Sequence, residues 1–399
     1  MLLKNVCRSV LILWLGWVLA SVSWSQTGQV VEGNNNQLEP SEPTGEFFSR
    51  WQQISRLEKQ ALNRYQKQIL QNWPKPLVSN VTTWVEYDNQ FQIRRVVDFE
   101  ANEVRVSLMN RVLDQTVDYA TMDDLVYDQL VKVLSSRISD ALKRDPLYQA
   151  IEKTTGQGSL SNEMVFSELF TSINPSQAEI EKLARKLFSR SFVQLDQRAA
   201  TTNPIKLKKA STYVMPLPED RLLKKARQYK AIVKQESQKA NVDSSIMFAM
   251  IHTESHFNPL AKSPIPAYGL MQIVPASGGR DASKVLFKNS KLLSPKYLYD
   301  PKNNIRVGTT YFNILYYKYF SGVKSQAARL YLSIAAYNAG IRKTARVFHR
   351  SGKLSDAVPE INKLSDKVLL TKLSKDIPYR ETRQYIKHVL SRANQYKYL

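Results

Sequence analysis

The sequence predicts an α+β N-terminal region followed by a mainly helical C-terminal region. Residues 81–108 are dense in Val, Thr, Trp, Tyr and Phe, which favour strands. In the second half of the chain, apolar residues recur almost throughout at helical spacing. Pro216 and Pro218 separate the two patterns. Because 399 residues are enough for two buried cores, we expect one domain over 45–215 and a second over 216–399.

The first 25 residues have the pattern of a secretory signal peptide. Two basic residues precede an apolar stretch over 10–20, and Ser23-Trp24-Ser25 provides a small-x-small cleavage site. This stretch is short beside the roughly 20 residues of a membrane-spanning helix, so we expect cleavage and export rather than an uncleaved anchor. Residues 26–44 are rich in Gly, Asn, Pro, Ser and Glu, which predicts a flexible linker.

The N-terminal elements alternate between helices and strands. In chain order they are a helix over 47–70, antiparallel strands over 91–99 and 104–106, a helix over 121–142, a helix over 176–188 and a strand within 205–215. The C-terminal elements are helices over 219–239, 243–257, 304–320, 324–337 and 379–395.

Charge and cysteine content restrict the partners. Cys7 is the only cysteine and lies in the expected signal peptide, so the mature protein would have no disulfide and no thiolate metal site. Residues 1–220 contain 25 Lys and Arg against 25 Asp and Glu, whereas residues 221–399 contain 32 against 10. This asymmetry favours an anionic polymer or surface as partner, with solubility as the alternative explanation. Because we expect export, nucleic acid is not expected.

One helix carries the main candidate for chemistry. An N-cap at Asp243 and a stop at Asn258-Pro259 place Glu254 in the last turn of this helix. The negative end of the helix dipole and the apolar neighbours both raise the pKa of a carboxyl group there, which suits a general acid. Taken alone, a helical glutamate is usually a solvated surface residue.

Three short runs follow Glu254-Ser255, and they favour a catalytic role for Glu254 over a solvated surface position. They are Gly-Leu-Met-Gln-Ile over 269–273, Ala-Tyr-Asn-Ala-Gly over 336–340 and Pro-Tyr-Arg-Glu-Thr-Arg-Gln-Tyr over 378–385. In this order they resemble the soluble lytic transglycosylase family, over about residues 221–399. The preceding region, with its Trp-Val-Glu-Tyr strand, resembles that of the membrane-bound lytic murein transglycosylase C family.

The resemblance implies a lysozyme-like catalytic domain that cleaves peptidoglycan glycan strands without a cofactor. Glu254 would protonate the β-1,4 glycosidic oxygen between N-acetylmuramic acid and N-acetylglucosamine (MurNAc–GlcNAc) and then act as a base. The 6-hydroxyl of muramic acid would attack its own anomeric carbon, which gives 1,6-anhydromuramic acid ends and gains from high effective molarity. The family also implies a periplasmic location associated with the outer membrane, and the basic C-terminal region is a candidate for membrane-surface contact.

The same resemblance assigns roles to six further residues. Ser255 would orient the Glu254 carboxylate, Met271 and Gln272 would line the sugar cleft, Tyr337 and Asn338 would approach Glu254 and the reacting sugar, and Glu381 would lie near the site.

Several alternatives stay open from the residues themselves. Most glycosidases use two carboxylates, and Asp281, Asp300 and Glu381 are candidates for a second one. A water-using muramidase on the same fold and a non-catalytic peptidoglycan-binding protein are therefore the alternative functions. His252 and His256 have the spacing of metal ligands, but the order His-Thr-Glu-Ser-His puts the glutamate on a different face of the helix, so no metal site is expected.

Overall fold

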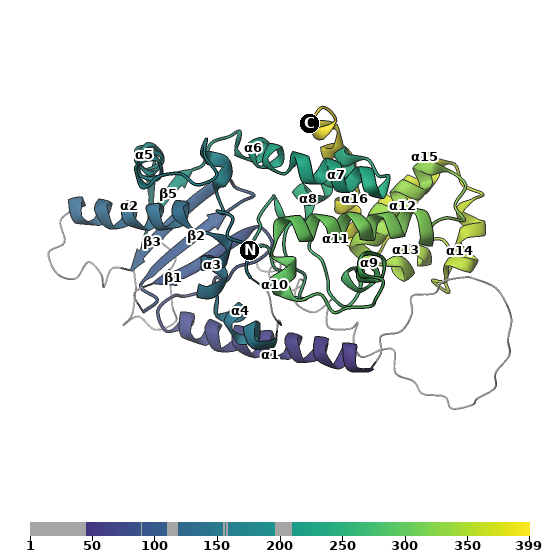
Figure 1. The fold of residues 1–399 in the computed structure, drawn as a ribbon, viewed down its shortest axis with the longest axis horizontal. Helices are drawn as coiled ribbons and strands as arrows, with labels where there is room; N and C mark the ends of the chain where they lie inside the picture. The colour runs from purple at the N-terminus through teal and green to yellow at the C-terminus, as the bar shows by residue number, and fades with distance from the viewer. Residues whose placement is uncertain (1–44, 89, 110–118, 155, 157–158, 196–209) are drawn as a thin grey trace, which may run out of the picture. The chain divides into compact units, whose positions relative to one another are not determined.

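An antiparallel sheet with its helices precedes a mainly helical region in the computed structural model (Figure 1), which confirms the predicted order of an α+β part and a mainly α part. The structure describes residues 45–88, 90–109, 119–154, 156, 159–195 and 210–399. The signal peptide and linker predicted for residues 1–44 lie outside this set. None of the helices in the described ranges combines the length and the apolar character needed to cross a membrane.

The sheet has five antiparallel strands in the order β1-β2-β3-β5-β4. Their bounds are β1 Thr83–Asp88, β2 Ile93–Asp98, β3 Glu103–Met109, β4 Phe192–Leu195 and β5 Ala210–Pro216. The predicted strands over 91–99 and 104–106 correspond to β2 and β3, and β5 pairs with β3 as expected for the returning strand. The edge strand β4 was not predicted, because its exposed Phe192 and Val193 lack the alternation of a half-buried strand.

Helices of the N-terminal part pack against this sheet and against each other. They are α1 Gly45–Leu70, α2 Tyr119–Ser135, α3 Ile138–Arg144, α4 Pro146–Ile151 and α5 Gln177–Phe188, with single 3₁₀ turns at Glu152–Thr154 and Ser167–Leu169. The prediction of one helix over 121–142 is wrong. The chain breaks at Arg137, which forms an isolated β-bridge with Met164, and the next amide, that of Ile138, donates to the carbonyl of Glu163 at 2.9 Å.

The C-terminal part contains the predicted helices and several short ones that the sequence analysis missed. They are α6 Arg221–Gln228, α7 Lys230–Ala240, α8 Ser244–Ser255, α9 Gly278–Phe287, α10 Pro295–Leu298, α11 Pro301–Ile314, a π-helical turn Leu315–Tyr319 (η5), α12 Gln326–Ala339, α13 Ile341–Arg346, α14 Leu354–Ile361, α15 Asp366–Lys375 and α16 Arg380–Tyr396. The helix predicted over 219–239 is divided at Tyr229 into α6 and α7.

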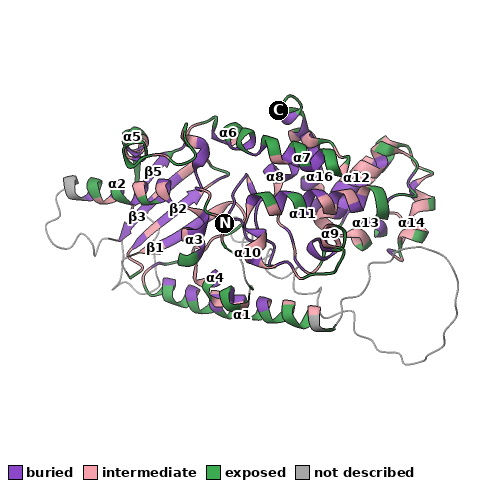
Figure 2. Ribbon diagram, in the orientation of Figure 1, coloured by how far each residue is buried: buried purple, intermediate pink, exposed green. Residues whose placement is uncertain are grey.

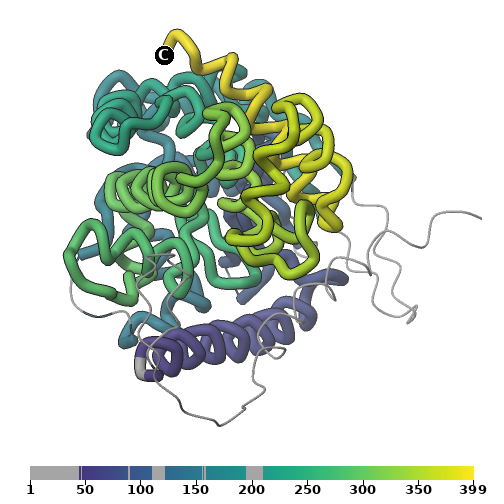
Figure 3. Tube along the Cα trace, turned by 90° about the vertical axis from the view of Figure 1, so that its right-hand side faces the viewer, coloured from purple at the N-terminus to yellow at the C-terminus, as the bar shows by residue number. Residues whose placement is uncertain are grey.

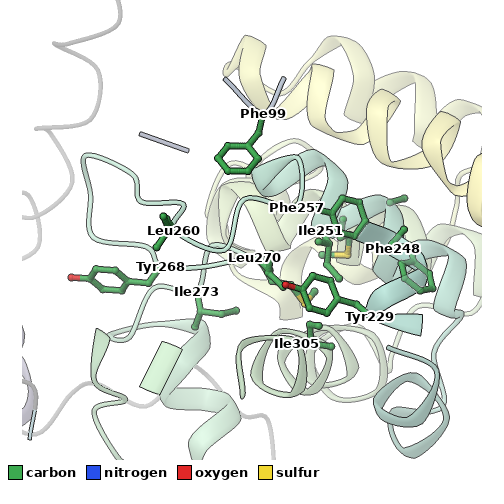
Figure 4. Packing of buried hydrophobic residues seen from close by; sticks show 14 of the residues in the cluster. Phe99, Tyr229, Phe248, Ile251, Phe257, Leu260, Tyr268, Leu270, Ile273 and Ile305 are labelled. Carbon is green, nitrogen blue, oxygen red and sulfur yellow. The ribbon is translucent and has the colours of Figure 1, made fainter. Parts of the chain in front are cut away.

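Helix α8 lies at the centre of the helical part, with α16 packed along it. Every residue from Ile246 to His252 is buried, so α8 is apolar on all sides rather than on one face. Figure 4 shows Phe248 and Ile251 of this helix in the same cluster as Tyr229 and Leu270. The last turn of α8, which carries Glu254, is therefore held on a rigid core element.

Buried charges join the two parts of the chain. The fully buried guanidinium group of Arg221 in α6 lies 3.4 Å from Glu168 and donates to the carbonyl of Phe99 at 3.1 Å. Lys225, also fully buried, lies 3.1 Å from the other carboxylate oxygen of Glu168.

Figure 2 shows the buried strands and the more exposed outer face of α1. The domain boundary between residues 215 and 216 stays a prediction.

Candidate active site

The end of α8 is defined by a change of backbone conformation. Asp243 caps the start of the helix, as predicted, by accepting a hydrogen bond from the Ser245 amide at 2.8 Å. At the other end, His256 and Phe257 have φ values of 51° and 59°, in the left-handed region where a helix cannot continue. Glu254 therefore lies in the last turn of α8, as predicted.

Glu254 has a strongly shifted acidity. Burial, the largest cause, raises its pKa to about 8 from an ordinary value of 4.5. The negative charge of Glu381 adds to the rise, whereas an interaction with the Tyr385 hydroxyl opposes it. The carboxyl group is therefore largely protonated at neutral pH, which is the state that a general acid requires.

Helix α16 brings two side chains towards this carboxyl group. Glu381 and Tyr385 are four residues apart, so they lie on the same face of α16. The Tyr385 side chain is buried, and its pKa is raised well above its ordinary value, first by burial and then by the Glu254 charge. Glu381 is exposed to solvent in the first turn of the helix.

The Gly-Leu-Met-Gln-Ile run forms a tight turn that Asn304 of α11 holds from inside. The Asn304 amide donates to the carbonyls of Tyr268 at 2.7 Å and Leu298 at 2.8 Å, and its oxygen accepts from the Met271 amide at 2.7 Å. Gly269 has a φ of +73°, and a Cβ atom there would lie 2.5 Å from the Asn304 side-chain nitrogen. Glycine is required at this position for both reasons.

The turn contacts the end of α8 and the start of the Tyr337 motif. The Ser255 hydroxyl donates to the carbonyl of Leu270 at 2.8 Å and is also 3.1 Å from the carbonyl of Ile251. The Tyr337 hydroxyl donates to the carbonyl of Met271 at 2.9 Å. The pKa of Tyr337 is raised well above its ordinary value, mainly by burial and next by the charge of Glu254. Tyr337, the turn and Glu254 thus form one site.

A family model described as "Transglycosylase SLT domain" matches residues 231–358, which contain Glu254, the turn and Tyr337. This match confirms the resemblance proposed from the motifs. Residues 231–358 are therefore similar to the transglycosylase SLT domain.

Individual proteins similar to this chain carry related names. The membrane-bound lytic murein transglycosylase C of Yersinia enterocolitica is 37% identical over 183 residues, which cover 46% of this chain and 50% of the relative. The protein of the same name from Pectobacterium atrosepticum is 28% identical over 322 residues, covering 80% of this chain and 84% of the relative. With most of these relatives the chain spans about half of the relative's length. A solved complex of the 70-kDa soluble lytic transglycosylase with bulgecin A shows 30% identity, a TM-score of 0.34, and coverage of 45% of this chain and 26% of that chain.

Three of the residues assigned from the motifs, Ser255, Met271 and Gln272, make different contacts in the site. The Ser255 hydroxyl bonds to main-chain carbonyls, so its contacts hold the turn rather than the Glu254 carboxylate. The Met271 side chain is fully buried, and a Cβ atom added at Gly308 would overlap its sulfur. The contact with Tyr337 is made by the Met271 main-chain carbonyl. Gln272 is partly exposed and donates to the carbonyl of Gly269 at 3.0 Å.

The last motif meets the Ala-Tyr-Asn-Ala-Gly run through a side-chain hydrogen bond. Thr382 donates to the Asn338 side-chain oxygen at 2.7 Å. This bond leaves the Asn338 amide group free to donate elsewhere and fixes its orientation. Together with Tyr385, Thr382 brings α16 into the same site as α8 and α12.

The three candidates for a second carboxylate have different positions. Asp281 accepts a hydrogen bond from the Tyr319 hydroxyl at 3.0 Å, and Asp300 caps α11 by accepting from the Asn303 amide at 2.9 Å. Neither changes the pKa of Glu254, whereas Glu381 does. Of the three, Glu381 is therefore the one that interacts with Glu254.

His252 of α8 and His256, the residue that ends this helix, both contact side chains of the last helix, α16. The His252 ring nitrogen Nδ1 is 3.0 Å from the Tyr396 hydroxyl, and burial lowers its pKa to about 3. His256 lies 3.4 Å from Arg392, and burial followed by the Arg392 charge lowers its pKa to about 4. Both rings are neutral at physiological pH. In the part of the chain that the structure describes, no cluster of three or more His, Cys, Asp or Glu could hold a metal ion.

Sequence reasoning gave no role to Tyr385, Thr382 or Asn304. Tyr385 could have been found, because it is four residues after Glu381 in a run already singled out and therefore shares its helix face. Thr382 and Asn304 act on residues 44 and 33 positions away, respectively. Only the packing of α11, α12 and α16 brings these residues to their partners.

Proposed function

We propose that this chain is a lytic transglycosylase that cleaves the MurNAc–GlcNAc β-1,4 bond of peptidoglycan and leaves 1,6-anhydromuramic acid ends. The observation that supports the proposal most directly is the place of Glu254 in the last turn of α8, within residues 231–358, where burial raises its pKa to about 8. A carboxyl group protonated at neutral pH donates its proton to the glycosidic oxygen, and the resulting carboxylate then accepts the proton of the muramic acid 6-hydroxyl. No cofactor takes part.

The surrounding residues are assigned roles that fit their contacts. Tyr385 interacts with Glu254 and stabilises its charged form after proton transfer. Gln272, Tyr337 and Asn338 bind the sugars next to the reacting bond, with the Met271 carbonyl and the Ser255 hydroxyl holding the turn in place. Glu381 adds to the burial effect by like-charge repulsion, which raises the pKa of Glu254 further.

A hydrolytic muramidase is the second candidate, and Glu381 is the observation that favours it. A carboxylate close enough to raise the pKa of Glu254 could activate a water molecule as the base of a two-carboxylate glycosidase. Glu381 is exposed at the start of α16, which leaves it solvated rather than held for chemistry. For this reason we rank the intramolecular reaction first.

The proposal extends to location and to the organisation of the chain. We infer a signal peptide over 1–25, a linker over 26–44, an α+β domain over 45–215 and a catalytic domain over 216–399. Export would place the enzyme in the periplasm, and the word "membrane-bound" in the relatives' names supports an association with the outer membrane. The basic C-terminal domain would contact peptidoglycan and an anionic membrane surface.

Product analysis tests the reaction. Purified sacculi are digested by residues 26–399 in heavy-oxygen water, beside a Glu254→Gln variant, and the products are identified by mass spectrometry. Unlabelled anhydromuropeptides from the wild type and none from the variant are expected. Reducing ends that carry the heavy oxygen would indicate a muramidase. Binding to sacculi without any released product would indicate a non-catalytic binding protein.

A further inference from the structure

Helix α1 of the N-terminal part carries a buried carboxylate that reaches the loop after α8. One carboxylate oxygen of Glu58, Oε1, lies 2.9 Å from the Lys262 ammonium group and accepts the Tyr268 hydroxyl at 3.0 Å. Glu58 is 4% exposed, Lys262 8% and Tyr268 0%. In Figures 1 and 3 α1 can be followed along the same side of the sheet and of the helical part. Figure 4 shows the Tyr268 hydroxyl pointing away from Leu270.

Lys262 and Tyr268 are the two sides of a narrow neck below the Gly-Leu-Met-Gln-Ile turn. They face each other as an antiparallel β-bridge, and the Gly269 amide donates to the carbonyl of Ala261 at 2.8 Å. Tyr268 is also bridged to Ile273 by two main-chain hydrogen bonds of 3.1 and 3.2 Å. A single oxygen of Glu58 therefore joins both sides of the neck from which the turn projects.

The turn above this neck is in direct contact with the candidate catalytic residues. Its Leu270 carbonyl accepts from Ser255, the neighbour of Glu254, and its Met271 carbonyl accepts from Tyr337. Asn304 fixes the inner side of the turn, as described above. Glu58 contacts the base of the turn through Lys262 and Tyr268.

Stability alone does not explain a charged pair at this place. Burying a carboxylate and an ammonium group costs desolvation energy, and apolar side chains of similar size are often as stabilising or more so. Burial raises the pKa of Glu58, and the Lys262 charge opposes that rise. The second oxygen of Glu58, Oε2, is buried and has no hydrogen-bond partner among the residues that the structure describes. What the pair provides is a directional connection.

We propose that Glu58 is a positioning residue of the active site: through Lys262 and Tyr268 it holds the 269–272 turn so that Gln272 and the Met271–Tyr337 contact are correctly placed beside Glu254. This proposal rests on the proposed function for its effect on catalysis. It assigns the N-terminal part of the chain a role in aligning the catalytic site, in addition to any contact with the substrate.

Two variants separate positioning from packing. Glu58→Gln removes the charge but keeps a hydrogen-bond acceptor, and the double variant Glu58→Leu/Lys262→Met replaces the pair by apolar side chains of similar length. Thermal unfolding, the kcat and KM for release of anhydro products from soluble glycan strands, and backbone hydrogen exchange over residues 261–273 are measured for each. The control is an exposed ion pair, which Glu360 of α14 forms with Lys363 just after this helix at 2.8 Å. The matched control double variant is Glu360→Leu/Lys363→Met.

The expected pattern is a dissociation between stability and rate. Glu58→Gln leaves the Lys262 charge unpaired and lowers the melting temperature. The Glu58→Leu/Lys262→Met variant regains most of this loss but not all of it, because the buried Tyr268 hydroxyl still lacks its acceptor. In both variants kcat is about ten- to a hundred-fold lower than in the wild type, with KM little changed. Exchange over 261–273 is faster in both Glu58 variants, and the control double variant changes neither rate nor exchange. Recovery of kcat together with stability would mean that the pair only packs, and unchanged exchange over 261–273 would equally overturn the proposal.

The exchange measurement needs no substrate, so it is independent of the proposed reaction. If the wild type releases no product, the proposed function fails while the exchange result still decides whether Glu58 holds the turn. If the Glu58→Gln variant does not fold, the apolar double variant supplies the same comparison.

Discussion

The Tyr337 hydroxyl donates a 2.9 Å hydrogen bond to the main-chain carbonyl of Met271, across 66 residues of sequence. It joins the turn after α8 to the end of α12, and both segments adjoin Glu254. The bond is made to a main-chain group, and the Met271 side chain packs in the core.

Tyr337→Phe removes this hydrogen bond and keeps the ring. We expect a loss of about 1 kcal/mol in the free energy of unfolding and a fall in kcat of about tenfold, because the turn loses one of its connections to the site. Chemical denaturation and release of anhydro products measure the two effects. Tyr398→Phe, at a 91% exposed tyrosine after α16, is the control and should change neither.

Glu381→Gln removes the negative charge that raises the pKa of Glu254. The general acid then loses its proton at lower pH, so the alkaline limb of the kcat/KM profile moves to lower pH. At about pH 8, where the wild type retains roughly half of its plateau rate, the variant should retain less than half of its own plateau. An exposed control, Glu360→Gln, should leave the limb in place. A variant without activity at any pH would instead indicate that Glu381 takes part in the chemistry.

Tyr385→Phe should shift the same limb in the opposite direction. The Tyr385 hydroxyl lowers the pKa of Glu254, so its removal raises that pKa further and extends the active pH range upwards. The plateau rate should fall about tenfold or more, because the carboxylate formed after proton transfer loses a stabilising partner. The pH–rate profile checks both effects, and a shift to lower pH would contradict the assigned interaction.

Glu254→Gln should stabilise the protein in a pH-dependent way. The pKa of Glu254 is about 8 in the folded chain and near 4.5 when unfolded, so the unfolded chain releases this proton first as the pH rises. The wild type therefore loses stability between about pH 4.5 and pH 8, whereas the glutamine variant does not. Its melting temperature should match the wild type at pH 4 or below and exceed it at about pH 8. Glu219→Gln, at an exposed position, should give the same melting temperature as the wild type at both pH values.

Gly269→Ala should destabilise the turn strongly. The residue has a φ of +73°, and the added Cβ atom would lie 2.5 Å from the Leu298 carbonyl oxygen. Left-handed strain and overlap together should cost about 2 to 4 kcal/mol in the free energy of unfolding. Gly340 has a φ of +86° and a ψ of 153°, a backbone conformation almost confined to glycine, with open space around it. Gly340→Ala therefore introduces backbone strain without overlap and should cost about 1 to 3 kcal/mol. Equal losses in the two variants would contradict the overlap.

The elements that sequence analysis predicted are those in which a long apolar pattern determines the structure. Helix α8 was found from its cap, its continuous apolar body and its Asn258-Pro259 stop, and strands β2 and β3 were found from their density of strand-forming residues. Short helices such as α10 and α13, of four and six residues, have too few turns to show a period. The raised pKa of Glu254 followed from its apolar surroundings, but the contribution of Tyr385 required the packing of α16 on α8.

The contact between Glu58 and Tyr268 had no sequence signature. The two residues are 210 positions apart, and their meeting depends on where α1 lies against the helical part. The same holds for Asn304, which looks like an ordinary polar residue in the first turns of α11 but bonds to three main-chain groups of the neighbouring loops.

The buried cations Arg221 and Lys225 restrict how genes for such proteins can recombine. Both belong to the helical half, yet the acids that pair with them are contributed by the other half: Glu168 lies beside both cations, and Glu163 lies 3.4 Å from Lys225. A crossover near residue 216 that brought in a partner half without Glu168 would leave the buried Arg221 without its carboxylate, at a cost of about 3 to 5 kcal/mol, and would leave Lys225 with Glu163 alone. We therefore expect viable chimaeras to inherit Glu168 and α6 from the same parent.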